Sequence, residues 1–258
     1  MSTIHPSAII DHEAQIDESV TIGPYVVIGG NVKIAKDTVI GAHAHIAGWT
    51  DIAEECVIGP HAVIGTEPQD LKFKGEESYL TIGRHTKIRE FANINRGTAQ
   101  GGGRTVIKEN CLIMAYVHIA HDCQVGNNVI LSNAVTFGGH VHVEDYAIIG
   151  GLTAVHQFIK IGEYAFVGGC SAVAMDIPPY AKAVGNRARL FGINSVGLQR
   201  NQFNPDEITL IKKAYRFLMS SKLNVSQALE AIKGLERIDK IDKIISFIEA
   251  SERGICRR

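Results

Sequence analysis

The residues best suited to proton-transfer chemistry gather in one stretch near the middle of the chain. They are His118, His121, Asp122, His140, His156 and Gln157. An imidazole has a pKa near neutrality, so it can accept the proton of a hydroxyl group, and a carboxylate can stabilise the imidazolium that forms. We therefore interpret His121 as a general base and Asp122 as its partner. No serine or cysteine nucleophile accompanies the histidines in a recognisable elbow, which favours direct transfer without a covalent enzyme intermediate.

The immediate neighbours of the central histidines bear on this chemistry. Adjacent residues on a strand point to opposite faces, so Asp122 need not touch His121, and a backbone carbonyl could orient the imidazole instead. Gly138 and Gly139 precede His140 and leave backbone N–H groups accessible. One of these N–H groups could stabilise an oxyanion.

Large apolar residues recur every six positions and indicate how these side chains are held. The central run is Ile107, Ile113, Ile119, Val125, Leu131, Phe137, Val143, Ile149, Val155, Ile161, Val167 and Val173. An earlier run from Ile4 to Ile64 is isoleucine at every sixth position, and it resumes at Ile82. Neither a helix nor a simple strand sustains a period of six, whereas hexapeptide periods are typical of parallel β-helices. The sequence therefore predicts an all-β parallel β-helix.

The same period places the polar residues relative to one another. If three hexads form one triangular coil, residues eighteen apart stack one strand spacing along the axis, about 4.8 Å. By this count the six residues named first fall on one corner in three successive coils, except His118, which lies on the preceding edge. This convergence favours a functional site over isolated structural histidines.

Two interruptions of the period predict loops that leave the coil. The first lies at about 65–80 and the second, which contains three consecutive glycines, at about 97–105. Loops on a regular scaffold are where binding groups concentrate. The first loop mixes polar, cationic and aromatic side chains, so we expect it to take part in binding.

The period changes after Pro178 and Pro179, because proline cannot donate to a strand ladder. Helices are expected to start at Asn204 and Asn224, and a third amphipathic segment contains Ile241 and Ile248. We predict a β-helix over residues 1–186 and a small C-terminal α-helical domain over 187–258. Cations cluster around Lys212, Lys213 and Arg216; they form either a solvated face or a docking surface for an acidic partner.

Composition excludes several classes of protein. The net charge is −1, which argues against a general nucleic-acid-binding surface. The N-terminus lacks a charged region followed by an apolar core, and the chain has no apolar run of about 18 residues. We expect a cytoplasmic protein with no integral membrane segment.

Several stretches together resemble the family of UDP-N-acetylglucosamine acyltransferases, which catalyse the first step of lipid A synthesis. The resemblance covers essentially the whole chain. It rests on residues 93–98 (NINRGT), 101–103 (GGG), 118–123 (HIAHDC), 138–141 (GGHV), 150–158 (GGLTAVHQF) and 168–171 (GGCS). The hexad period is shared by many acyltransferases, whereas HIAHDC and AVHQF together are highly specific.

The resemblance implies a left-handed β-helix, a homotrimer with active sites between subunits, and no cofactor or metal. It implies transfer of an (R)-3-hydroxyacyl group from acyl carrier protein to the sugar 3-hydroxyl. In that interpretation His121 is the base, Asp122 its partner and Gly139 the oxyanion donor. The implied substrate-binding residues are Gln69, Asp70, Lys72, His118, His140, His156, Gln157, Gly169, Asn194 and Arg200. Gly169 matches the position that limits acyl-chain length, and glycine there implies a long chain.

Two departures and several alternatives stay open. Val196 replaces the acidic residue of the family pattern and Asn201 replaces the second of two arginines. Both lie at the nucleotide end, so N-acylation of an amino sugar, as by the sister enzyme of the pathway, is one alternative. Acetyl-CoA-dependent transfer is another, and a structural or ice-binding rod a third. A γ-carbonic-anhydrase-like zinc enzyme would use His118, His121 and His140.

Overall fold

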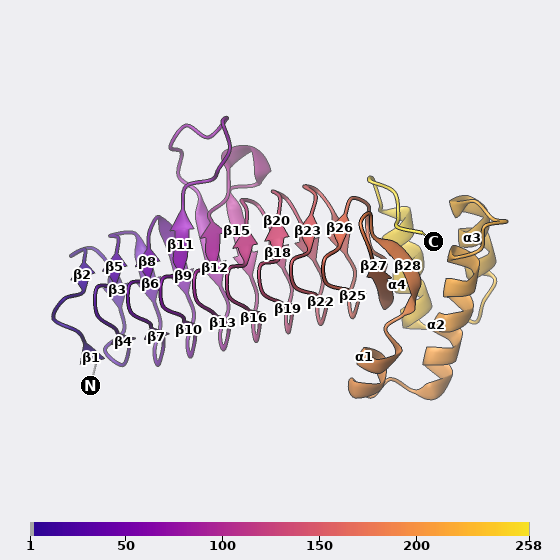
Figure 1. The fold of residues 1–258 in the computed structure, drawn as a ribbon, viewed down its shortest axis with the longest axis horizontal. Helices are drawn as coiled ribbons and strands as arrows, with labels where there is room; N and C mark the ends of the chain where they lie inside the picture. Colours follow the sequence, from indigo (N-terminus) through magenta and orange to yellow (C-terminus); the bar gives the residue numbers. More distant parts are fainter. Residues whose placement is uncertain (1–2, 258) are drawn as a thin grey trace.

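The computed structural model describes residues 3–257 and shows a rod of short strands with helices at one end (Figure 1). The outermost positions of the two predicted ranges, residues 1, 2 and 258, lie outside the described part. The strands form three sheets, which we call A, B and C and which are parallel except for the last strand of sheet A. The chain visits them in turn, so that each coil contributes one strand to each sheet.

Sheet A contains β1 (Thr3–Ile4), β4 (Thr21–Ile22), β7 (Val39–Ile40), β10 (Val57–Ile58), β13 (Lys87–Ile88), β16 (Leu112–Ile113), β19 (Ile130–Leu131), β22 (Ile148–Ile149), β25 (Phe166–Val167), β27 (Ala181–Val184) and β28 (Arg189–Ile193). Sheet B contains β2 (Ile9–Ile10), β5 (Val27–Ile28), β8 (His45–Ile46), β11 (Val63–Thr66), β14 (Asn93–Asn95), β17 (His118–Ile119), β20 (Thr136–Phe137), β23 (Ala154–Val155) and β26 (Ala172–Val173). Sheet C contains β3 (Gln15–Ile16), β6 (Val32–Ile34), β9 (Trp49–Ile52), β12 (Tyr79–Ile82), β15 (Arg104–Ile107), β18 (Gln124–Val125), β21 (His142–Val143) and β24 (Lys160–Ile161).

The strand register confirms that eighteen residues close one coil. Ile119 pairs with Phe137, and Phe137 pairs with Val155. In the two-residue strands from β4 onward the second residue points into the coil and is buried, while the first faces outward. The apolar residues at every sixth position therefore form a continuous core along the rod.

Two connections project from the same side of the rod (Figure 1). One joins β11 to β12 through residues 67–78, which we call the substrate loop. The other joins β14 to β15 through residues 96–103, which we call the glycine loop; it contains the 3-10 helix Ala99–Gly101. After each loop the coil resumes its register.

The C-terminal part contains α1 (Ser195–Arg200), α2 (Pro205–Leu218), α3 (Val225–Lys233) and α4 (Asp239–Glu249). The predicted starts at Asn204 and Asn224 are confirmed, because each side chain caps a helix in a capping box with the residue three positions later. Two features were not predicted, the antiparallel pairing of β27 with β28 and the helix α1. The segment around Gly185 is the turn between the two strands, and α1 directly follows β28.

No helix within residues 3–257 is long and apolar enough to cross a membrane.

Candidate active site

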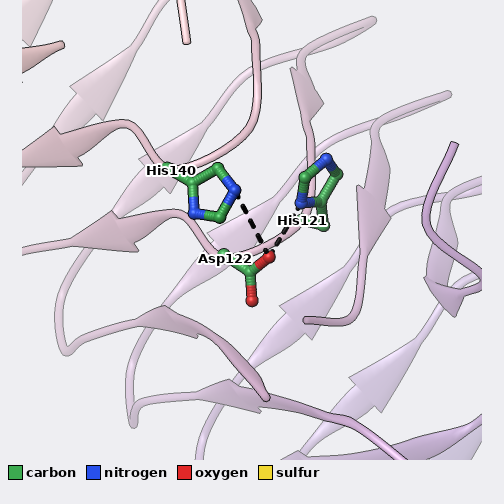
Figure 2. Close-up of side chains that lie close together, drawn as sticks. All are labelled: His121, Asp122 and His140. Carbon is green, nitrogen blue, oxygen red and sulfur yellow. Dashed lines mark hydrogen bonds and ion pairs between the residues drawn. The ribbon is translucent and has the colours of Figure 1, made fainter. Parts of the chain in front are cut away.

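The predicted catalytic residues lie on the corner between sheets B and C, which we call the B–C corner. His121 and Asp122 connect β17 to β18, and His140 connects β20 to β21 one coil further along. Figure 2 shows the two imidazoles on either side of the Asp122 carboxylate. The count of eighteen residues per coil thus brings these three side chains together as expected.

His121 and Asp122 are in direct contact, although they are neighbours in the chain. The distance from His121 Nδ1 to Asp122 Oδ2 is 2.8 Å. Asp122 has a left-handed backbone with φ 60°, a conformation that aspartate tolerates better than most residues. The argument from strand alternation does not apply because the corner is not a strand.

The ionised carboxylate can only accept hydrogen bonds, so Nδ1 of His121 carries the proton. Nε2 of the same ring then keeps a free lone pair and can act as a base. The His121 side chain is 14% exposed, and Asp122 is fully buried. The base is therefore accessible, whereas its carboxylate partner is not.

Asp122 is held by residues from a preceding part of the coil. The Thr98 N–H donates to Oδ1 at 2.9 Å, and the Thr98 hydroxyl donates to Oδ2 at 2.7 Å. The Asp122 N–H donates to the Thr105 hydroxyl at 2.8 Å. Burial alone would raise the pKa of the Asp122 carboxyl, but the hydrogen bonds from His121 and Thr98 outweigh burial and lower that pKa.

His140 lies on the other side of the carboxylate. Its Nε2 is 3.8 Å from Asp122 Oδ2, and its ring meets the His121 ring edge-on at 5.1 Å. The opposite neighbour is Phe158, which stacks on His140 at 4.3 Å. Burial lowers the pKa of His140, although the negative charges of Asp122 and Asp70 oppose the shift. His140 is thus favoured as a neutral group.

Gly139 packs against the base. A Cβ atom at Gly139 would lie 2.5 Å from Cε1 and 2.7 Å from Nε2 of His121, so no side chain fits there. The Gly139 N–H has no hydrogen-bond acceptor among residues 3–257. Both observations agree with the predicted oxyanion donor, which stays a prediction.

The other predicted residues on this side of the coil take different positions. His156 and Gln157 are exposed on the B–C corner one coil beyond His140. His118 lies on β17, where its Nδ1 is 2.9 Å from Asn93 Oδ1 and burial lowers its pKa. As the first residue of that strand, His118 faces outward from sheet B beside the corner, as the count of eighteen residues predicts.

The substrate loop carries Gln69, Asp70 and Lys72. The negative charge of Asp70 opposes the lowering of the His140 pKa. Asp70 Oδ1 accepts the Lys72 N–H at 3.0 Å and fixes the local turn. Gln69 and Lys72 are exposed.

Three predicted residues lie away from the B–C corner. Gly169 connects β25 to β26, so it lies on the corner between sheets A and B. Asn194 caps α1 and donates to the Tyr164 carbonyl at 2.9 Å, on the corner between sheets C and A. Arg200 is exposed at the end of α1. One chain by itself does not bring these three residues to His121.

Sequence reasoning missed Thr98, Thr105 and Phe158 as parts of the site. Phe158 follows His140 by eighteen residues, so the same count that grouped the histidines would have found it. Thr98 gives no periodic signal, because the glycine loop interrupts the period.

Within residues 3–257, the cluster of groups able to bind a metal is His121, Asp122 and His140, whose ligand atoms lie within 4.8 Å of one another. The zinc hypothesis names His118 in place of Asp122. The structure instead places the His118 Nδ1 against Asn93, and the Asp122 carboxylate already accepts hydrogen bonds from Thr98 and His121. The observed set suits an oriented imidazole better than a three-histidine zinc site.

Comparison with known proteins agrees with this arrangement. Residues 176–256 match the family model described as UDP N-acetylglucosamine O-acyltransferase, domain 2, and residues 31–66 and 104–139 match the bacterial transferase hexapeptide model. The acyl-(acyl-carrier-protein)–UDP-N-acetylglucosamine O-acyltransferases of Janthinobacterium sp. (strain Marseille) and Thermodesulfovibrio yellowstonii are each 50% identical, with both chains fully covered.

Solved structures agree along the whole length. The UDP-N-acetylglucosamine acyltransferase of Francisella novicida has a TM-score of 0.96 at 38% identity, covering 99% of this chain and 94% of that one. The enzyme of Bacteroides fragilis has a TM-score of 0.95 at 42% identity, covering 99% and 100%. The predicted left-handed β-helix with a helical C-terminus is confirmed. The chain belongs to the family of acyl-(acyl-carrier-protein)–UDP-N-acetylglucosamine O-acyltransferases.

Proposed function

We propose that this chain transfers an (R)-3-hydroxyacyl group from acyl carrier protein to the 3-hydroxyl of UDP-N-acetylglucosamine, with His121 as general base. The coarser activity, O-acyl transfer to UDP-N-acetylglucosamine in lipid A biosynthesis, follows from full-length relatives at 50% identity. The observation that supports the mechanism is the 2.8 Å contact between His121 Nδ1 and the buried Asp122 carboxylate.

The reaction proceeds by direct attack. His121 Nε2 takes the proton of the sugar 3-hydroxyl while the hydroxyl oxygen forms a bond to the thioester carbonyl carbon. Negative charge develops on the carbonyl oxygen and is stabilised by the Gly139 N–H. The carbon–sulfur bond then breaks, and the imidazolium returns its proton to the thiolate of the carrier. The fixed Asp122 carboxylate stabilises the imidazolium in between.

The remaining predicted residues supply binding. We propose that Gln69, Asp70 and Lys72 reach the sugar and phosphate groups from the substrate loop. The cleft for the sugar and the acyl chain is lined by His118, His140, His156 and Gln157, in agreement with the family pattern. Gly169 lets a long acyl chain pass, while Asn194 and Arg200 hold the nucleotide.

A homotrimer would complete such a site, because Gly169, Asn194 and Arg200 lie away from the B–C corner of their own chain. The outward faces of the sheets support this assembly. Sheet A presents mainly apolar side chains, namely Val39, Val57, Leu112, Ile130, Ile148 and Phe166, with Lys87 between Val57 and Leu112. Sheet C presents mainly polar ones, including Lys33, Asp51, Gln124, His142 and Lys160. Packing sheet A against another face of the next subunit closes a ring and leaves sheet C in water.

We propose that the reaction takes place in the cytoplasm, the compartment that the sequence leads us to expect. The test of the proposed mechanism uses purified protein with UDP-N-acetylglucosamine and (R)-3-hydroxyacyl carrier protein. We expect His121→Ala to lower kcat by about 10²–10⁴-fold, the usual contribution of a general base. A folded His121→Ala protein with full activity would exclude His121 as the base.

A further inference from the structure

The glycine loop packs against the Asp122 carboxylate through Thr98 and Gly101. Thr98 is 4% exposed and donates to both carboxylate oxygens, once through its N–H and once through its hydroxyl. It comes from the connection between β14 and β15, twenty-four positions earlier in the chain. Neither the reaction scheme above nor the family pattern used so far gives Thr98 a role.

We propose that Arg96 and Thr98 are the positioning residues of this active site, each acting on a different part of it. Thr98 fixes the carboxylate that orients His121, and Arg96 fixes the loop that carries Gln69, Asp70 and Lys72. The inference rests on the proposed transferase function and deepens it. It predicts that the two residues affect different kinetic constants.

The glycine loop is shaped around the carboxylate. The Thr98 hydroxyl donates to Asp122 and accepts the Gly101 N–H at 3.1 Å, so its donor and one acceptor position are both used. The Thr98 carbonyl accepts the Gly103 N–H at 2.7 Å. A Cβ atom at Gly101 would lie 2.1 Å from Asp122 Oδ2. Glycine at this position leaves the space that the carboxylate occupies.

The hydroxyl of Thr98 is thus the feature that matters. Serine preserves the donor and the acceptor, whereas valine has the same shape as threonine and loses both. With valine, the carboxylate keeps the hydrogen bond from the backbone N–H of residue 98. It loses the hydroxyl that donates to Oδ2, the oxygen that faces His121. The imidazole is then less firmly oriented when the sugar hydroxyl gives up its proton.

Arg96 acts on the substrate loop. Its side chain is 7% exposed, and its guanidinium lies 5.1 Å from the Phe73 ring and 5.6 Å from the Trp49 ring. Its Nη2 is 3.6 Å from Glu67 Oε1, and Nη1 donates to the Gly65 carbonyl at 3.4 Å. Gly65, Glu67 and Phe73 flank the residues proposed to contact the sugar and phosphates. One buried cation therefore holds the loop at both ends of its binding segment.

The first experiment compares Thr98→Val with Thr98→Ser. We expect Thr98→Val to lower kcat roughly 10- to 100-fold, with KM for UDP-N-acetylglucosamine within about twofold of wild type, because a hydrogen bond to a charged group is lost. Thr98→Ser should recover most of the rate. In spectra of ¹⁵N-histidine-labelled protein, the His121 Nδ1–H signal should change in Thr98→Val and return in Thr98→Ser.

Two outcomes would overturn the role of Thr98. One is a Thr98→Val protein with wild-type kcat and an unchanged His121 signal. The other is a Thr98→Ser protein as impaired as Thr98→Val, which would assign the effect to packing of the methyl group. If Thr98→Val does not fold, Gly101→Ala tests the same point, because its Cβ would overlap the carboxylate that Thr98 holds and displace it. A wild-type kcat in Gly101→Ala would then contradict the proposal.

The second experiment compares Arg96→Met with Arg104→Met. Arg104 is an exposed arginine that directly follows the glycine loop, and its guanidinium lies 5.0 Å from the Tyr79 ring. We expect Arg96→Met to raise KM for UDP-N-acetylglucosamine about tenfold with little change in kcat, since the cation–π contacts are lost. Phe73→Leu should shift KM in the same direction, and Arg104→Met should behave as wild type. An unchanged KM in both Arg96→Met and Phe73→Leu would overturn this role.

These outcomes are separable from the proposed function. If wild-type protein yields no 3-O-acyl product, the proposed function fails. If wild type is active, His121→Ala is inactive and Thr98→Val and Arg96→Met match wild type, only the positioning proposal fails.

Discussion

The Asp122 carboxylate accepts hydrogen bonds from two directions, from the His121 ring and from Thr98. A buried carboxylate is costly unless it is paired and hydrogen-bonded, and this one is both. The arrangement gives His121 one tautomer and one orientation. It leaves the Nε2 atom able to accept a proton, while the carboxylate side chain itself is fully buried.

The contact between Gly139 and the base predicts the effect of a methyl group. Gly139→Ala would place Cβ within 2.5 Å of the His121 ring, so the imidazole or the corner must move. We expect kcat to fall about 10²–10³-fold, comparable with the loss of an oxyanion donor. The control is Gly29→Ala, whose Cβ meets its nearest atom at an ordinary 3.6 Å. Equal activity of the two variants would contradict close packing at Gly139.

The lowered pKa of His118 predicts how stability depends on pH. Burial holds the folded-state pKa below the usual 6.5, so the unfolded chain binds a proton first as the pH falls. The contribution of neutral His118 to stability is therefore complete above about pH 6.5 and declines as the pH falls toward the folded-state pKa. Thermal melts between pH 7.5 and about pH 5 should show a shallower loss of stability in His118→Gln than in wild type.

The matched control for that melt series is His12→Gln, since the His12 side chain is 90% exposed. Its stability should follow the wild-type curve over the whole pH range. Identical slopes in wild type and His118→Gln would mean that neutral His118 contributes nothing to the pH dependence.

At the scale of elements, the coil itself was predictable because its signal is repeated. Every strand contributes an inward apolar residue at the same phase, and the count of eighteen residues then located His121, His140 and Gln157 on one corner. The contact of Asp122 with His121 was not predictable from strand geometry, since it depends on the left-handed backbone of Asp122. The sequence shows where a corner lies but not how its side chains turn.

The two loops and the C-terminal connection were harder to predict for a different reason. Thr98 reaches Asp122 across an irregular connection, so no fixed spacing relates them. The helix α1 has six residues, including Gly197, and gives little helical period. The strand β28 pairs antiparallel with β27, whereas the preceding coil is parallel throughout, so extrapolation of the repeat does not reach it.

The corner between sheets A and B predicts a change in acyl selectivity. Gly169 is exposed, and a Cβ there would approach the Gly151 carbonyl at 3.1 Å, so two glycines of successive coils leave this surface without side chains. We expect Gly169→Met to shift the preferred donor toward shorter acyl chains, because its side chain would fill the space that we propose for the chain end. The measurement is competition between carrier thioesters of different length, with product masses as readout.

Gly169→Ser, with a much smaller side chain, is the graded comparison and should shift the preference less than Gly169→Met. Unchanged selectivity in both variants would show that the acyl chain does not reach this corner.

At the scale of the whole molecule, the predicted site is divided between corners that one chain does not bring together. His121 lies on the B–C corner, while Asn194 lies against the corner between sheets C and A. The proposed trimer removes the difficulty by pairing each His121 with Arg200 of a neighbouring subunit. Its mass in solution should be three times the 28.0 kDa of the chain.

Mixing two inactive variants tests the shared site. His121→Ala and Arg200→Ala chains, co-expressed in equal amounts, should form mixed trimers in which about a quarter of the sites have both residues intact, if each site draws them from neighbouring chains. Activity should then rise well above that of either variant alone. If both residues act within one chain, no mixed trimer contains an intact site and activity stays at the level of the separate variants.

The central claim is that an oriented His121 takes the proton of the sugar hydroxyl while that hydroxyl attacks the thioester directly. Mass spectrometry and NMR of the product, made from a mixture of carrier and CoA thioesters with N-acetylglucosamine and amino-sugar nucleotides, test it most directly. The account predicts a single 3-O-acyl UDP-N-acetylglucosamine, formed from the hydroxyacyl carrier protein and lost in His121→Ala. An N-acylated product, or turnover with acetyl-CoA alone, would contradict it.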